Sequence, residues 1–151
     1  YVNLWTAADP SAITAHLGTM FANNRNINLP PHQDSSFSAN CTLPSGGTVV
    51  AMTGHFHPRG RQFTGFETPN GVDPGNQCYQ SSDWSEPPFV LLDPPLSIPS
   101  GGGLSYTCSF FNDTDFPITF GPHVEYEEHC NLFAYFYATG LDPNSRARYC
   151  F

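Results

Sequence analysis

The chain has 151 residues, of which 39% are hydrophobic, and a formal net charge of -8 from 13 acidic and 5 basic residues. This length is typical of one domain with its own hydrophobic core, and we predict a single domain over residues 1–151. The acidic balance excludes nucleic acid and anionic membrane surfaces as favoured partners, and no apolar run reaches the roughly 20 residues of a membrane span.

Short strands joined by turns are the predicted architecture, because 15 Pro and 13 Gly interrupt the chain every few residues. Nine or ten such strands predict an all-β fold, a sandwich of two sheets. In chain order we predict a strand at 1–6, a turn at 9–11 capping a short helix at 12–16, an apolar segment at 27–29, strands at 37–43, 48–57, 62–67, 76–80, 89–92, 96–98, 104–111 and 118–120, and a core strand at 127–139.

The five cysteines indicate an oxidising compartment, since the chain is also acidic and poor in lysine. Four of them can form two bridges and leave one over, but spacing alone does not select the pairs. We therefore predict a secreted, extracellular or periplasmic protein. The first residues resemble the middle of a strand, so we expect that a targeting segment was removed or that the domain was cut from a longer chain. Asn40 and Asn112 match the glycosylation sequon, which also arises by chance.

A His-x-His pattern in the strand at 48–57 is the strongest chemical signal. Side chains alternate along a strand, so His55 and His57 lie on one face, about 7 Å apart along the backbone, and Phe56 lies on the other. Pro58 and Gly60 end the strand at a turn. Two imidazoles so placed can converge on one metal ion.

A third metal ligand is expected from a distant segment, as is common in zinc and copper sites. His129 is the leading candidate because it directly precedes the predicted core strand, and His123 is a rival or a fourth ligand. Glu128 is a candidate hydrogen-bond partner for a ligand imidazole, against the alternative of a solvated carboxylate at a strand end. The sequence around His16 and His32 does not indicate a metal-ligating role.

Six ordered segments carry a resemblance to a known family. They are Cys41, His55–Gly60, Tyr79–Trp84, Gly103–Cys108, Phe120–Gly121 and Glu128–Phe133. Together they resemble the C-terminal catalytic domain of the copper type II, ascorbate-dependent monooxygenases, the peptidylglycine α-hydroxylating and dopamine β-monooxygenase family. The resemblance covers nearly the whole chain.

The resemblance implies a jelly-roll-like antiparallel β-sandwich and a set of paired and ligating residues. The implied bridges are Cys108 to Cys130 and Cys41 to Cys150, and the implied ligands of the oxygen-binding copper are His55, His57 and the residue before Cys130. Cys78 is left unpaired, as a small buried hydrophobe or the site of an intermolecular bridge.

Two residues depart from the family pattern. The family places methionine at the position of His129 and tends to carry tyrosine at that of Phe133. A thioether selects Cu(I), whereas three imidazoles suit Cu(II), Cu(I) or Zn(II). The family's companion N-terminal domain, with its second copper, is not among these residues, so two-copper hydroxylation is not expected of this chain alone.

Three functional hypotheses follow. In the first, His55, His57 and His129 hold copper in a monooxygenase-like oxidoreductase that uses dioxygen, a small-molecule substrate and a separate redox partner. In the second, the same site belongs to a non-catalytic metal-binding or structural module of a larger extracellular assembly. In the third, zinc occupies the site and activates water, with Glu127 or Glu128 as the base. Copper is the expected cofactor, with zinc as the alternative, and catalysis stays open.

Overall fold

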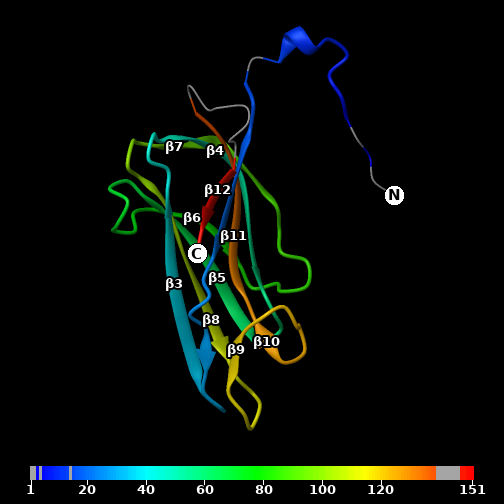
Figure 1. Cartoon of the computed structure of the whole chain (residues 1–151), viewed down its shortest axis with the longest axis vertical. Helices are drawn as coiled ribbons and strands as arrows, with labels where there is room; N and C mark the ends of the chain where they lie inside the picture. The colour runs from blue at the N-terminus through cyan, green and yellow to red at the C-terminus, as the bar shows by residue number, and fades with distance from the viewer. Residues whose placement is uncertain (1–2, 4, 14, 139–146) are drawn as a thin grey trace.

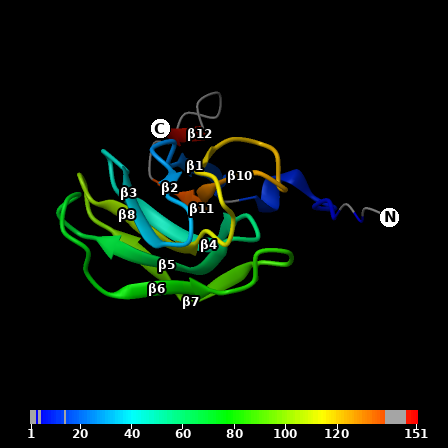
Figure 2. The same cartoon turned by 90° about the horizontal axis from the view of Figure 1, so that it is seen from below.

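Two facing β-sheets form most of the molecule (Figures 1 and 2). The computed structural model describes residues 3, 5–13, 15–138 and 147–151. The first sheet has the spatial order β12 (Ala147–Cys150), β1 (Gly18–Asn23), β11 (Cys130–Tyr137), β4 (Gly47–Phe56) and β7 (Val90–Ile98). The second has the order β3 (Asp34–Thr42), β8 (Gly103–Phe111), β5 (Gly60–Thr68) and β6 (Gln77–Ser81). A small third sheet contains β10 (Glu127–Glu128), β9 (Ile118–Phe120) and β2 (Asn28–Leu29).

Most neighbouring strands are antiparallel, which confirms the predicted all-β sandwich. The exceptions among the described strands are the parallel pairs of β1 with β12 and of β9 with β10. Aromatic and aliphatic residues of the inner faces fill the space between the two large sheets. Within this core Phe63 stacks on Tyr106 at a centroid distance of 5.5 Å. A Cβ at Gly54 would lie 2.5 Å from the Phe63 ring, so this glycine lets the sheets approach closely beside His55.

Two disulfides join the two large sheets, and both are the bridges that the resemblance implied. Cys41 of β3 is bonded to Cys150 of β12, and Cys108 of β8 is bonded to Cys130 of β11. These bridges fit the predicted oxidising compartment. Cys78 is the free cysteine, and burial raises the pKa of its thiol to about 11, as expected for an unreactive, partly buried side chain.

Asn112 lies inside the protein although it heads a glycosylation sequon. Its side chain is 0% exposed, and its amide nitrogen donates to the carbonyl oxygens of Leu29 and Phe116, both at 2.9 Å. Its Oδ1 accepts hydrogen bonds from Thr114. Asn112 therefore holds the turn between β8 and β9 against β2.

The start of the chain differs from the prediction. Tyr1, Val2 and Leu4 lie outside the described residues, and the rest of the segment predicted as a strand at 1–6 has no regular structure. The predicted helix at 12–16 is instead the 3-10 helix η1 (Pro10–Ala12). It begins earlier because Asp9 caps it by accepting the Ser11 N–H, and Pro10 fixes its first φ angle.

Three strand predictions in the remainder of the chain were wrong in their bounds or number. The segments at 89–92 and 96–98 form the single strand β7, which tolerates Pro94 and Pro95 because it lies at the edge of its sheet. The predicted core strand at 127–139 is divided at His129 into β10 and β11, and position 139 lies outside the described residues. Strands β1 and β12 were not predicted.

None of the helical segments in the described residues is long and apolar enough to cross a membrane.

Removal of each disulfide should destabilise the fold by an amount that follows the length of the closed loop. The bridge at Cys41 spans 109 residues and that at Cys108 spans 22. We expect C41A/C150A to lower the free energy of unfolding by about 5 kcal/mol and C108A/C130A by about 3 kcal/mol. Urea unfolding of both double variants measures this order, and the reverse order would contradict it.

Candidate metal centre

His55 and His57 lie on one side of the end of β4. Phe56 between them points into the core and is 1% exposed, so the alternation of the strand turns both imidazoles to the opposite side, where His57 is buried and His55 is partly exposed. Their ring centroids are 5.3 Å apart. The chain then turns back, since the Gly60 N–H donates to the His57 carbonyl oxygen at 2.9 Å. This is the shared face that the sequence predicts.

His129 reaches the same place from the other end of the sequence. It lies between β10 and β11, and the antiparallel pairing of Cys130 with Phe56 sets it beside His57. The bridge from Cys130 to Cys108 fixes this end of β11 to the second sheet. The His129 ring centroid is 4.5 Å from that of His57 and 5.9 Å from that of His55.

The three imidazoles form a group that suits a metal ion. One nitrogen from each of His55, His57 and His129 lies within 4.8 Å of the others. His57 Nε2 and His129 Nδ1 are 3.0 Å apart. Two nitrogens bound to one tetrahedral ion at 2.0–2.1 Å would be about 3.3 Å apart. The donor set and its spacing therefore fit a copper or zinc ion.

A backbone carbonyl orients His57 for this role. His57 Nδ1 lies 2.8 Å from the Glu127 carbonyl oxygen, which can only accept a hydrogen bond. The Nδ1–H therefore donates to it, and the lone pair of Nε2 accepts a hydrogen bond from His129 Nδ1–H, which a metal ion would replace. Glu128 was expected to hydrogen-bond a ligand imidazole. The backbone carbonyl of Glu127 makes this contact with His57 instead.

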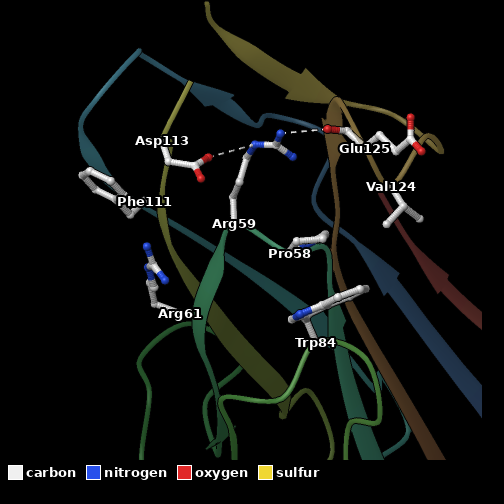
Figure 3. Close-up of a pocket in the computed structure, with 8 residues that line it drawn as sticks. All are labelled: Pro58, Arg59, Arg61, Trp84, Phe111, Asp113, Val124 and Glu125. Carbon is white, nitrogen blue, oxygen red and sulfur yellow. Dashed lines mark hydrogen bonds and ion pairs between the residues drawn. The ribbon is translucent and has the colours of Figure 1, made fainter. Parts of the chain in front are cut away.

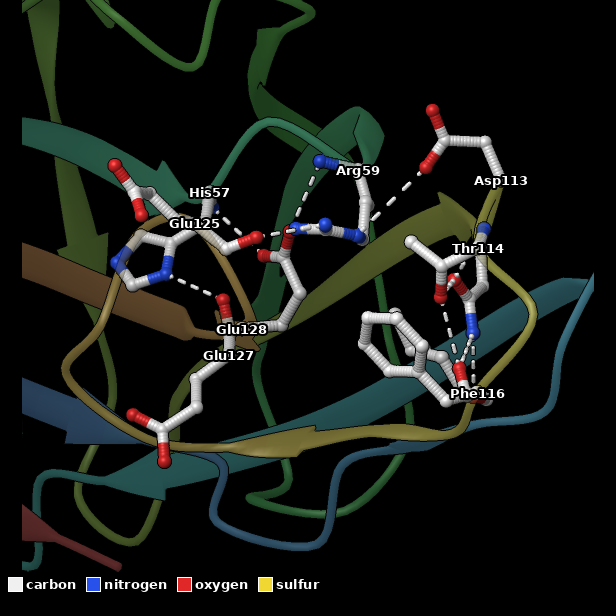
Figure 4. Close-up of polar contacts among 10 residues, drawn as sticks. His57, Arg59, Asp113, Thr114, Phe116, Glu125, Glu127 and Glu128 are labelled. Carbon is white, nitrogen blue, oxygen red and sulfur yellow. Dashed lines mark hydrogen bonds and ion pairs between the residues drawn. The ribbon is translucent and has the colours of Figure 1, made fainter.

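The carboxylate of Glu128 instead binds the backbone of both histidine segments, and Figure 4 shows its contacts with His57 and Arg59. Its Oε2 accepts the N–H of His57 at 2.8 Å and that of His129 at 3.3 Å, and its Oε1 accepts the N–H of Arg59 at 2.9 Å. Glu128 is 0% exposed, so the alternative of a solvated carboxylate is wrong. Burial raises the pKa of this carboxyl to about 7, against the opposing effect of the three N–H donors.

Two histidines of the cluster, His55 and His129, resist protonation. Burial, and then the neighbouring His57 and His55, lower the pKa of His129 to about 4. Burial and the neighbouring His57 also lower the pKa of His55. Both effects disfavour the charged imidazolium, so these side chains stay neutral near pH 7, the form that binds a metal.

The stability of the metal-free protein should depend on pH through His129. The pKa of His129 is lower in the folded state than in the unfolded state. The contribution of His129 to the free energy of unfolding is therefore complete above about pH 6.5 and is lost as the pH falls toward 4. We expect the stability advantage of the wild type over His129→Gln to shrink by about 1 kcal/mol over this range, since His129 is half-exposed and screened by solvent.

Urea unfolding of both chelator-treated proteins between pH 7 and pH 4.5 measures this difference. Glu128 is present in both proteins, so the opposite pH dependence of its carboxyl cancels in the comparison. If the free energies of unfolding of the two proteins changed in parallel with pH, the lowered pKa of His129 would be contradicted.

His123 lies outside the histidine group, although its position suggested a further ligand. Its Nδ1 is 2.6 Å from the Glu127 carboxylate, and its ring stacks on Tyr126 at 4.8 Å. The same contact occupies the Glu127 carboxylate, and Glu128 is buried against backbone N–H groups. Neither carboxylate is free to act as a base on water at the cluster, so the zinc hydrolase hypothesis is not supported.

An exposed aromatic surface borders the cluster on the outer side of the first sheet. His55 pairs in register with Asn131, and the next row of that side contains Thr53, Phe133 and Phe21. We call the surface that continues from this row the aromatic face; its residues are Phe21, Phe89, Phe133, Tyr135, Tyr149 and Phe151, which contact one another in pairs. The partly exposed side of the cluster therefore opens next to apolar rings.

The fold and the cluster define an all-β, disulfide-linked domain with a three-histidine cluster that fits a metal ion. The family model described as copper type II ascorbate-dependent monooxygenase, C-terminal domain, matches residues 12–151, and the chain belongs to this family. The family is copper-dependent, and the three-histidine site fits copper. A comparison with curated proteins gave no significant match.

Proposed function

We propose that this chain is an extracytoplasmic copper protein in which His55, His57 and His129 hold one copper ion. The observation that carries the proposal is the convergence of three imidazole nitrogens within 4.8 Å, from two segments far apart in the sequence. The copper-dependent family and the lowered pKa values of His55 and His129 support it. The two disulfides support a location outside the cytoplasm.

Monooxygenase-like oxidation of an apolar small molecule is the first candidate activity. Copper bound in this site would supply one-electron redox chemistry with dioxygen as co-substrate. The protein's own contribution is to orient His57 through the Glu127 carbonyl and to offer the aromatic face as a water-poor surface for substrate. A separate redox partner would supply electrons.

A non-catalytic copper module of a larger assembly is the second candidate, and His129 favours it. Three imidazoles bind Cu(II) and Cu(I) alike, whereas a thioether at this position would favour Cu(I). A site of three imidazoles lacks the preference for Cu(I) that the family's methionine would give, and this difference favours copper binding or carriage over turnover. Oxygen consumption by the copper-loaded protein with ascorbate separates the candidates, because only the first predicts uptake above that of free copper.

Copper binding itself is tested with matched histidine variants. We expect the wild type to bind one equivalent of Cu(II) with nitrogen couplings in its electron paramagnetic resonance spectrum. His129→Ala should weaken the affinity by more than about 100-fold, because it removes a ligand rather than a supporting contact. His123→Ala is the control and should bind as the wild type does. Equal affinity of His129→Ala and His123→Ala would remove His129 from the site.

The nature of the third ligand should set the redox potential. We expect His129→Met to raise the Cu(II)/Cu(I) reduction potential, because a thioether stabilises Cu(I) relative to imidazole. Voltammetry of the wild type and the variant, both loaded with one copper equivalent, measures this change. An unchanged or lower potential in His129→Met would show that position 129 does not contact the ion.

A further inference from the structure

We propose that a pocket behind the histidine cluster binds a small organic anion that carries a flat ring. The pocket has a volume of about 350 Å³ and opens beside the turn that follows His57 (Figure 3). Three separate segments supply its walls: the turn with Arg59 and the start of β5 with Arg61, the loop with Trp84, and the loop with Val124. Phe111 and Asp113 close it at the end of β8. This volume is in the range of small-molecule sites.

Arg61 supplies a cation that the described protein groups leave available. Its guanidinium carbon lies 5.5 Å from the centroid of the Phe111 ring. No carboxylate of the described residues forms an ion pair with it. A guanidinium offers planar N–H pairs that match the two oxygens of a carboxylate. Arg61 is therefore the expected contact of the acidic group.

Arg59 is a fixed second cation in the same wall. Its Nη2 donates to the Glu125 carbonyl oxygen at 2.7 Å, and its backbone N–H donates to Glu128. Its Nε is buried, has no hydrogen-bond partner among the described residues and forms an ion pair with Asp113 Oδ1 at 3.8 Å. Arg59 therefore helps to fix the wall, and Arg61 is the cation left for a ligand.

Trp84 forms the apolar wall that a flat ring would contact. Its side chain is 40% exposed, although a free indole of this size is costly to leave in water. The loop that carries it is held by Asp83, whose Oδ1 accepts the N–H groups of Ser85 and Glu86 at 2.9 and 3.0 Å. The backbone that carries the indole is therefore ordered before binding, which lowers the entropy cost of holding the loop against a ligand.

The pocket wall contains two arginines and two acidic residues, and among the described residues Arg61 is the arginine of this wall without a carboxylate partner, which favours an anionic ligand. In Figure 3 the Glu125 carboxylate points away from Arg59, while its carbonyl faces it. Asp113 approaches Arg59, which leaves Arg61 uncompensated. The net charge of -8 repels anions at long range, so recognition has to come from these short-range contacts. The expected ligand therefore needs both an acidic group and a ring.

Fluorescence of Trp84 provides a direct test in copper-free protein, so the outcome does not depend on the proposed copper function. The chain has two tryptophans, and Trp5→Phe leaves Trp84 as the only reporter. We expect benzoate to give a saturable change in this variant with a Kd of about 1 mM. Benzamide lacks the charge and acetate lacks the ring, so both should bind at least about tenfold more weakly.

Two arginine substitutions in the Trp5→Phe background complete the test. Arg61→Gln should weaken benzoate binding about tenfold, as expected for loss of a charge-assisted contact. Arg25→Gln is the matched control, because Arg25 also lies over an aromatic ring, 4.3 Å from the centroid of Phe151, but outside the pocket. No saturable benzoate signal, equal binding of benzamide, or equal effects of the two substitutions would each overturn the proposal.

Discussion

The buried carboxylate of Glu128 is the contact on which the candidate metal centre depends. A fully buried carboxylate needs hydrogen-bond donors, and here the donors are backbone N–H groups on both sides of the site. The turn that follows β4 and the junction between β10 and β11 are thereby joined at one point. Because these donors are on the main chain, the contact fixes backbone positions and leaves the imidazoles free for another partner.

The sandwich around this contact makes the site rigid before any ligand arrives. The bridge from Cys108 to Cys130 lies one residue from His129, and the close approach of Phe63 to Gly54 lies one residue from His55. Side chains held in this way lose little conformational freedom on binding. The same turn also carries Arg59 into the neighbouring pocket, so two chemically different surfaces share one rigid junction.

Local pattern was sufficient to predict part of the site. Alternation along a strand placed His55 and His57 on one face, and Pro and Gly at frequent intervals predicted short strands. The two bridges came from the family resemblance, because spacing could not choose among pairs of cysteines. Strand β1 escaped prediction because Gly18 and Asn23 have low strand propensity and the sheet neighbours decide its conformation.

Contacts between distant segments explain the remaining failures of prediction. Nothing in the sequence near Glu128 indicates that its carboxylate binds the backbone around His57, more than 60 positions earlier. The pocket that contains Arg61 and Trp84 was missed for the same reason. The chain has 5 basic residues against 13 acidic ones, and two of the basic residues, Arg59 and Arg61, lie two positions apart beside the His-x-His pattern. This pairing of scarce cations was the signal that could have drawn attention to the pocket.

The buried position of Asn112 has a consequence for the biosynthesis of the protein in a cell that attaches oligosaccharides. The transferase requires an accessible amide, whereas here that nitrogen is already shared between two carbonyl oxygens in the interior. A sugar chain can therefore be added only to a nascent polypeptide, before β2 docks on the β8–β9 turn. Any molecule modified at that moment would be unable to close this corner, so sugar attachment and maturation compete for the same side chain.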